Sequence, residues 1–183
     1  RANKPQDALQ WFKSAQRQGV VGDTVMYNAA ISACARSKRW SQAMQLVEDM
    51  QAKGIPANAI TYNAAISACE KGRQWQRALQ LMADMQAQGI PANTITYNAA
   101  ISACEKGRQW RHALQLMADM QAKDIPADTI TYSAAISACE KGRQWQRALQ
   151  LMVDMQANGI PTDTITYNAA ISACEKGGQC QPA

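Results

Sequence analysis

The chain has 183 residues, with 19 Lys and Arg against 14 Asp and Glu, which gives a net charge of +5 at neutral pH. Apolar residues make up 47% of the chain and aromatic residues 6%, a composition typical of a protein with a buried core. No apolar run approaches the roughly 18 residues that a membrane span requires, so we expect no membrane partner. The positive charge permits an acidic partner such as a nucleic acid without requiring one.

One tyrosine and one cysteine recur at intervals of 35 residues along the whole chain. The tyrosines are Tyr27, Tyr62, Tyr97, Tyr132 and Tyr167. Residues 59–93 and 94–128 differ at only six of 35 positions. Such near identity indicates one supersecondary unit stacked on itself, in a solenoid where each unit contacts mainly its neighbours.

Each unit is predicted to fold as two helices. Residues 4–18 align with a second helix, without a first helix before them. The motif TITYNAAISACEKG, as at residues 94–107, predicts a first helix, and RQWQRALQLMADMQAQG, at residues 73–89, predicts a second. Gly72 is expected to end the first helix in the left-handed conformation, and Gly89 to end the second. No segment alternates with a period of two, so the predicted fold class is all-α.

These boundaries divide the chain into one array of repeats. Residues 1–23 form a partial repeat with a second helix and linker only, and residues 164–183 a partial repeat with a first helix only, predicted at residues 168–176. The complete repeats are 24–58, 59–93, 94–128 and 129–163. Because half a repeat is missing at each end, we expect the chain to be a fragment of a longer array.

The two faces of each first helix differ in character. One face is expected to pack, and in the repeat 59–93 it comprises Tyr62, Ala65, Ile66 and Cys69. The opposite face carries an aliphatic residue, an amide, a hydroxyl and a cation, namely Ile60, Asn63, Ser67 and Lys71. Such a stripe is ordinarily the solvated face of a helix, but solvation does not explain an exposed Ile or Val in every repeat.

A periodic surface matches a periodic ligand, and single-stranded nucleic acid offers one base and one phosphate per step. An amide has both a donor and an acceptor for a base edge, an aliphatic side chain can lie between bases, and a cation can contact a phosphate. The stripe therefore favours a nucleic-acid groove.

The 35-residue unit with TYNAAISACEKG, an ALQLMADMQ helix and a GIPAN linker resembles the pentatricopeptide repeat family, with repeats of the P type. The resemblance covers essentially the whole chain. The tetratricopeptide repeat differs, with a period of about 34 and a tryptophan and glycine signature that is absent here. The resemblance implies a right-handed α-solenoid, or superhelix, of helix-turn-helix repeats that binds single-stranded RNA with one base per repeat, usually in mitochondria or chloroplasts.

In that family the residue after the tyrosine and the last residue of the linker select the base together. The resemblance assigns these roles to Asn28 with Asn58, Asn63 with Asn93, Asn98 with Asp128, Ser133 with Asp163, and the unpaired Asn168. It implies a pyrimidine, a pyrimidine, uracil and guanine, read 5′ to 3′, and a further pyrimidine at Asn168. The linker Asn and Asp residues are also good N-caps for the following helix, and the two roles are compatible.

The resemblance likewise assigns the two other positions of the stripe. The aliphatic residues that would lie between bases are Val25, Ile60, Ile95, Ile130 and Ile165. The cations that would contact phosphates are Arg36, Lys71, Lys106, Lys141 and Lys176.

Other motifs favour a structural interpretation. Five cysteines recur singly on the packed face, which indicates core thiols and a reducing compartment. Zinc sites use closely spaced Cys or His pairs, and His112 is the sole histidine, so neither a metal nor another cofactor is expected. The four tryptophans that recur once per repeat are interpreted as inter-repeat packing, and they are Trp40, Trp75, Trp110 and Trp145. No Ser, His and Asp set and no Gly-rich phosphate loop is present, so no catalytic residue is expected, although a domain outside these residues remains open.

The expected function is therefore sequence-selective binding of single-stranded RNA by a monomer, in organellar RNA processing, editing, stability or translation. The alternative is a protein-binding α-solenoid that holds a peptide on the same surface.

Overall fold

The computed structural model describes residues 5–177, and the outermost residues of the two predicted partial repeats, 1–4 and 178–183, lie outside it. Ten helices make up the described part, without a strand, and the predicted all-α class is confirmed. They are α1 (Pro5–Arg17), α2 (Thr24–Arg36), α3 (Trp40–Ala52), α4 (Ala59–Lys71), α5 (Trp75–Ala87), α6 (Thr94–Lys106), α7 (Trp110–Ala122), α8 (Thr129–Lys141), α9 (Trp145–Ala157) and α10 (Thr164–Lys176).

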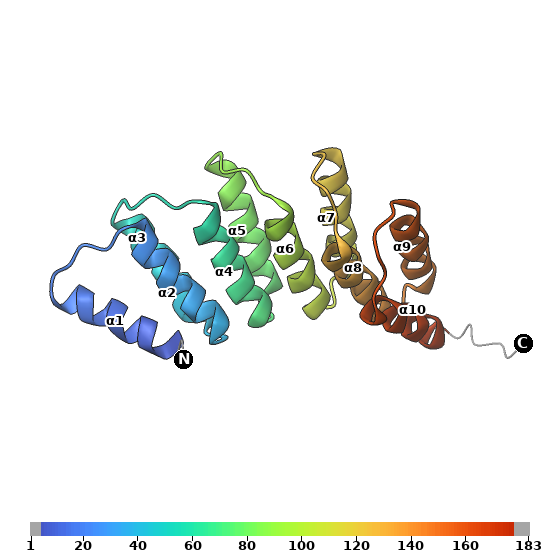
Figure 1. The fold of residues 1–183 in the computed structure, drawn as a ribbon, viewed down its shortest axis with the longest axis horizontal. Coiled ribbons are helices and arrows are strands. Elements are labelled where there is room, and N and C mark those ends of the chain that lie inside the picture. Colours follow the sequence, from blue (N-terminus) through green and yellow to red (C-terminus); the bar gives the residue numbers. More distant parts are fainter. Residues whose placement is uncertain (1–4, 178–183) are drawn as a thin grey trace, which may run out of the picture. The chain divides into compact units, whose positions relative to one another are not determined.

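The helices form two compact units, residues 1–92 with α1 to α5 and residues 93–183 with α6 to α10. Within each unit the first helices pack against one another, α2 on α4 in one unit and α6, α8 and α10 in sequence in the other (Figure 1). Within a unit, a second helix that has a first helix on either side packs against both, as α3 does with α2 and α4, α7 with α6 and α8, and α9 with α8 and α10. Each unit is therefore two layers of helices, with the first helices in one layer and the second helices in the other.

The predicted packed face of the first helix is the core of each repeat. Tyr62, Ala65 and Ile66 are buried, and the corresponding residues of α2, α6 and α8 are buried as well. The second helices add Met50, Met85, Met120 and Met155 to this core. None of the described helices is both long and apolar enough to cross a membrane.

The repeating cysteines lie in the core, as predicted. Cys34, Cys69, Cys104 and Cys139 are fully buried and none forms a disulfide. Burial raises the pKa of the Cys69 and Cys139 thiols to about 11 and that of the Cys104 thiol to about 12. A thiol reagent reacts with the thiolate, so these side chains are protected twice, by burial and by protonation.

The sixth cysteine, Cys180, lies outside the described residues, and with it replaced by serine, thiol labelling should consequently proceed in two phases. Cys174 on α10 is only half-buried and should react first, while the four core cysteines should react at the rate at which the repeats open. Mass spectrometry of a time course at pH 8 would show the order. Equal labelling rates at Cys104 and Cys174 in the folded protein would contradict the packing.

The turn between the first and second helix differs from its prediction. Gly72 has φ −84° and is not left-handed, and the next residue, Arg73, takes the left-handed conformation with φ 57°. Gly72 has a packing role instead, because a Cβ built on it would lie 2.4 Å from Cδ1 of Trp40 in the preceding repeat. Gly142 meets Trp110 and Gly177 meets Trp145 in the same way, which confirms the interpretation of these tryptophans as inter-repeat packing.

The turn after the second helix follows its prediction. Gly54, Gly89 and Gly159 have φ between 65° and 70°. Asp124 stands at the same position in its repeat and keeps the same conformation, with φ 53°, and the Ile125 amide still donates to the Met120 carbonyl at 2.9 Å. This turn therefore survives the loss of glycine, at the cost of a strained backbone.

Candidate nucleic-acid interface

The predicted stripe of aliphatic side chains is exposed in every repeat. Each is the second residue of its first helix, and the exposed fractions run from 61% to 73%. They are Val25, Ile60, Ile95, Ile130 and Ile165. An exposed β-branched residue at one fixed position per repeat gives each unit an apolar row on the layer of first helices.

The predicted selector residues Asn28 and Asn58 lie in contact. The Asn28 Nδ2 donates to Asn58 Oδ1 at 3.2 Å, although 30 residues separate the two in sequence. Asn58 is the N-cap of α4 and accepts from the Thr61 amide at 3.1 Å, while the Thr61 hydroxyl donates to Asn28 Oδ1 at 2.6 Å. The Asn28 amide is thus held at both its oxygen and its nitrogen.

The second unit repeats this network with a carboxylate. Asn98 Nδ2 donates to both carboxylate oxygens of Asp128, at 3.0 and 3.1 Å, and the Thr131 hydroxyl donates to Asn98 Oδ1 at 2.6 Å. Asp128 is the N-cap of α8. Capping and contact with the selector amide are therefore combined in one side chain, in both units.

Ser133 and Asp163 are linked indirectly. The Ser133 hydroxyl lies 2.7 Å from the Thr166 hydroxyl, and Thr166 donates to Asp163 Oδ1 at 2.6 Å. The shorter serine side chain stops at the threonine, whereas an asparagine reaches the N-cap residue.

The remaining predicted selectors are single positions. Asn63 lies on α4 in the first unit, and Asn93 is the N-cap of α6 in the second unit. Asn168 is exposed on α10.

The linker that carries each N-cap is tied to the preceding first helix. The Thr24 hydroxyl donates to the Pro56 carbonyl at 2.9 Å, and Thr94 and Thr129 bond the carbonyls of Pro126 and Pro161 at 2.9 and 3.0 Å. Since each proline lies two residues before an N-cap residue, these bonds help to position the N-cap residue relative to the selector residue on the preceding first helix.

A set of threonines was missed by sequence reasoning. Each is fully buried at the third position of its first helix, and they are Thr61, Thr96, Thr131 and Thr166. In α4, α6 and α8 they complete a reciprocal capping box with Asn58, Asn93 and Asp128. The signal was present in the sequence as an Asn or Asp followed three residues later by Thr.

Hydrogen bonds keep the Asp128 carboxylate charged. Burial alone would raise its pKa, but the bonds from the Thr131 amide and from Asn98 outweigh burial and lower the pKa below its ordinary value. Bonds from the Thr166 side chain and amide likewise lower the pKa of Asp163.

Lowering the pH should therefore destabilise the fold in part by protonating the N-cap carboxylates Asp128 and Asp163. Because the folded pKa of Asp128 lies below the unfolded value, its contribution to stability is present above about pH 4 and is lost as the pH falls through the folded pKa. Asp128→Asn, which reproduces Asn93 of the preceding repeat, should match the wild type at pH 7 and lose less stability towards pH 3. Melting temperatures across this range test the expectation, and parallel curves would refute it.

Two of the predicted phosphate-contacting cations are engaged within the protein. Lys141 pairs with Glu105, and Lys176 pairs with Glu140, in each case across adjacent first helices. Ser172 also donates to Glu140, at 3.1 Å. Lys71 has Ala35 where these lysines have a glutamate, and it makes no ion pair within residues 5–177. The cations of the stripe therefore differ in whether a carboxylate of the protein already pairs with them.

The described residues hold no group of three or more His, Cys, Asp and Glu side chains that could bind a metal ion.

This geometry defines an α-solenoid of helix hairpins, with a polar pair held at the joint between successive first helices. Residues 6–182 match the family model described as the pentacotripeptide-repeat region of PRORP. The chain belongs to the pentatricopeptide repeat family, as its sequence predicts.

Solved structures share this fold. The chain is 25% identical to the pentatricopeptide repeat protein PPR10 from maize, over 96% of this chain and 25% of that one, with a TM-score of 0.76. PPR10 in complex with an 18-nt psaJ RNA element matches 96% of this chain and 26% of that one, with 22% identity and a TM-score of 0.77. The PPR domain of Arabidopsis thaliana protein-only RNase P 1, in complex with tRNA, matches 93% of this chain and 90% of that one, with 14% identity and a TM-score of 0.79.

A search of curated protein sequences found no match. The chain spans a quarter of the length of the PPR10 chain in its free structure.

Proposed function

We propose that this chain binds single-stranded RNA and reads one base per repeat with the residue pairs at its joints. The observation that carries the proposal is the contact between Asn98 and Asp128, which join successive first helices beside the exposed Ile95 and Ile130. Two similar structures, PPR10 with an RNA element and the PRORP1 PPR domain with tRNA, support an RNA partner.

The buried threonines suggest how such a pair selects a base. With Thr131 donating to its oxygen and its nitrogen facing Asp128, the Asn98 amide has a defined orientation, so it presents the same groups to every base that arrives. A site with fixed hydrogen-bond groups rejects a base that leaves them unpaired, because unpaired buried polar groups are costly.

The proposed reading, 5′ to 3′, is a pyrimidine, a pyrimidine, uracil and guanine, followed by a pyrimidine at Asn168. Each base belongs to one repeat with the boundaries 24–58, 59–93, 94–128 and 129–163, and the partial repeats 1–23 and 164–183 flank them. The proposed setting is a monomer in a chloroplast or mitochondrion, where it serves RNA processing, editing, stability or translation without catalysing a reaction itself.

Exchange of one selector residue tests the proposal. The chain should bind the RNA CCUGC in fluorescence anisotropy more tightly than variants with a purine at either of the first two positions. Ser133→Asn, which reproduces Asn98, should shift the preference at the fourth base from G towards U by about fivefold or more, the low end of what a mismatched base costs in specific complexes.

The control is Gln156→Asn, at an exposed position of α9 in the layer of second helices, which should leave the preference unchanged. Binding that depends on salt but not on sequence would reduce the groove to a cationic track. No binding by a folded protein, even when repeats are added, would favour a peptide ligand on this surface instead.

A further inference from the structure

Every described turn between a first and a second helix carries a cation in the left-handed conformation. The residues are Lys38, Arg73, Arg108 and Arg143, with φ between 56° and 58°. For a residue with a side chain this conformation costs about 1–2 kcal/mol relative to glycine. The turns after the second helices have the same conformation and hold a glycine there, at Gly19, Gly54, Gly89 and Gly159, or in one case an acidic residue, Asp124.

The helix dipole does not account for this difference. Both kinds of turn follow a helix C-terminus, where a cation is equally favourable, and Lys53 and Lys123 lie in turns after second helices. Only the turns between a first and a second helix, however, place the cation at the left-handed residue itself. A strained cation in each of these four turns therefore indicates a use for positive charge on the edge of each unit where the turns lie.

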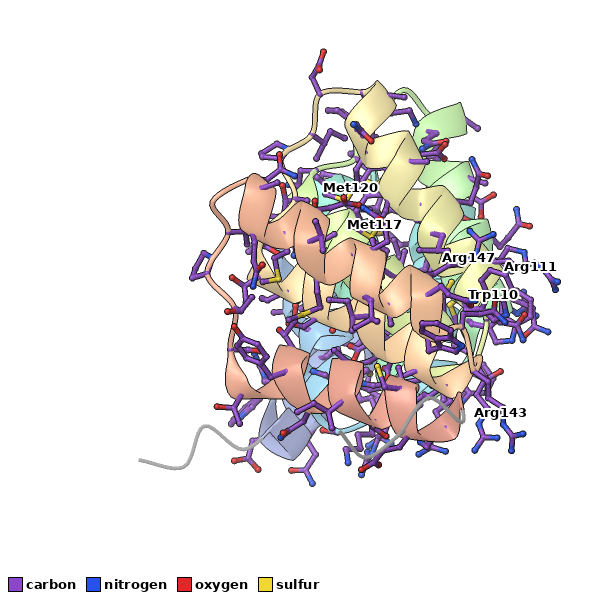
Figure 2. The ribbon with its side chains drawn as sticks, turned by 90° about the vertical axis from the view of Figure 1, so that its right-hand side faces the viewer. Trp110, Arg111, Met117, Met120, Arg143 and Arg147 are labelled. Atoms are coloured by element: carbon purple, nitrogen blue, oxygen red, sulfur yellow. The ribbon has the colours of Figure 1, made fainter. Side chains whose placement is uncertain are left out.

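In the second unit this edge is built around Trp110. The guanidinium carbon of Arg111 lies over the Trp110 ring at 4.6 Å from the centroid, and that of Arg147, from the next repeat, lies over it at 5.2 Å. Figure 2 shows both arginines beside Trp110, and Arg143 lies on the same side of the molecule. Stacking on an aromatic ring restrains a guanidinium group while leaving its N–H groups available, so less freedom is lost when an anion binds.

The charges of this edge are not compensated. Residues 107–112 and 142–147 include no Asp or Glu, and the nearby Glu105 and Glu140 are paired with Lys141 and Lys176. Arg111, Arg143 and Arg147 are exposed and form no ion pair within the described residues. The positive charges of these three arginines are therefore not neutralised by any carboxylate of the described residues, and they are available to bind an anion.

The edge also lacks the apolar surface of a protein interface. None of the exposed large apolar side chains of the described part belongs to residues 107–112 or 142–147. Protein interfaces are centred on buried apolar and aromatic contacts, whereas nucleic-acid interfaces are polar and positively charged. The chemistry of the edge therefore fits phosphate groups.

We propose that Arg111, Arg143 and Arg147 form a second phosphate-binding surface, which holds RNA that extends beyond the bases read in the groove. Arg143 lies two residues after Lys141, at the end of α8, so a strand that leaves the groove can continue onto the edge. The inference rests on the proposed function, since it takes RNA as the ligand, but it concerns a different surface and no base selection.

The test compares two triple variants of equal charge. Arg111→Gln, Arg143→Gln and Arg147→Gln remove the edge, and Gln already stands at the position of Arg111 in two other repeats, as Gln76 and Gln146. The control is Gln86→Glu, Gln121→Glu and Gln156→Glu, at equivalent exposed positions near the other end of the second helices. Circular dichroism and thermal melting check folding, and the single Arg111→Gln variant serves if the triple variant is unfolded.

Two RNAs separate the surfaces, CCUGC and the same sequence extended on both sides with oligo(A). The extension should raise the affinity of the wild type and of the control, and the edge variant should lose this gain. Three lost phosphate contacts should reduce the slope of log K against log salt by about 2, which amounts to about 16-fold between 50 and 200 mM salt. Affinity for the short RNA should be the same in the edge variant and the wild type.

An unchanged gain from the extension in the edge variant would overturn the inference, and so would an equal loss in the control, which would mark a general effect of charge. If poly-glutamate competes for the edge while the extension has no effect, the surface binds an acidic protein instead. If the short RNA does not bind, that result counts against the proposed base reading but not against the edge. The edge is still tested, because binding of the extended RNA can be compared between the two triple variants.

Discussion

Replacement of Gly142 with alanine should destabilise the second unit by about 1–3 kcal/mol, the usual cost of overpacking a well-packed site. A Cβ at this position would lie 2.3 Å from Cδ1 and 2.7 Å from Cγ of Trp110. Neither atom can yield easily, because the ring also lies beneath the guanidinium groups of Arg111 and Arg147. The glycine is therefore required by the close approach of two repeats.

Urea denaturation followed by circular dichroism would measure this effect, with Gly159→Ala as the matched control. Gly159 is left-handed, with φ 67°, and nothing lies within 4 Å of the added Cβ, so its replacement should cost only the backbone strain of about 1 kcal/mol. Adding Trp110→Ala to Gly142→Ala should recover part of the loss caused by the glycine change. A smaller effect at Gly142 than at Gly159 would contradict the proposed packing role.

Removal of Glu105 and Glu140 should strengthen RNA binding if the proposed function is correct. These carboxylates pair with Lys141 and Lys176, two of the predicted phosphate contacts, so a phosphate must compete with them. Glu105→Gln with Glu140→Gln should increase the slope of log K against log salt by about 1.4, at roughly 0.7 for each lysine released, and should raise affinity several-fold at low salt.

The first unit offers the reverse experiment. Ala35 occupies the position of these glutamates, and Lys71 has no ion pair in the described part of the chain. Ala35→Glu should therefore weaken RNA binding, provided that the buried site of Ala35 accepts the larger side chain, which thermal melting would show. An unchanged salt slope in the double glutamine variant would mean that these lysines do not reach phosphates.

The pairing of the selector residues could be predicted only through the family resemblance. Asn98 and Asp128 are 30 residues apart, and their contact depends on the packing of α6 against α8. The capping role of Asp128, in contrast, is local and was readable from its place before a helical segment. Thr131 takes part in both kinds of contact, because its bond to Asp128 lies within the first turn of α8 and its bond to Asn98 crosses to the preceding repeat.

The sequence alone determined the period, the class and the packed face, because a 35-residue repeat and the helical spacing of Tyr62, Ile66 and Cys69 are properties of the chain itself. Only the tertiary structure decided why Gly72 is a glycine and which lysines are already paired. Both answers lie in the neighbouring repeat: Trp40 fills the space beside Gly72, and the preceding repeat offers Glu105 to Lys141 and Glu140 to Lys176 but only Ala35 to Lys71. Contacts of this kind arise where surfaces meet in space, so no pattern within one repeat contains them.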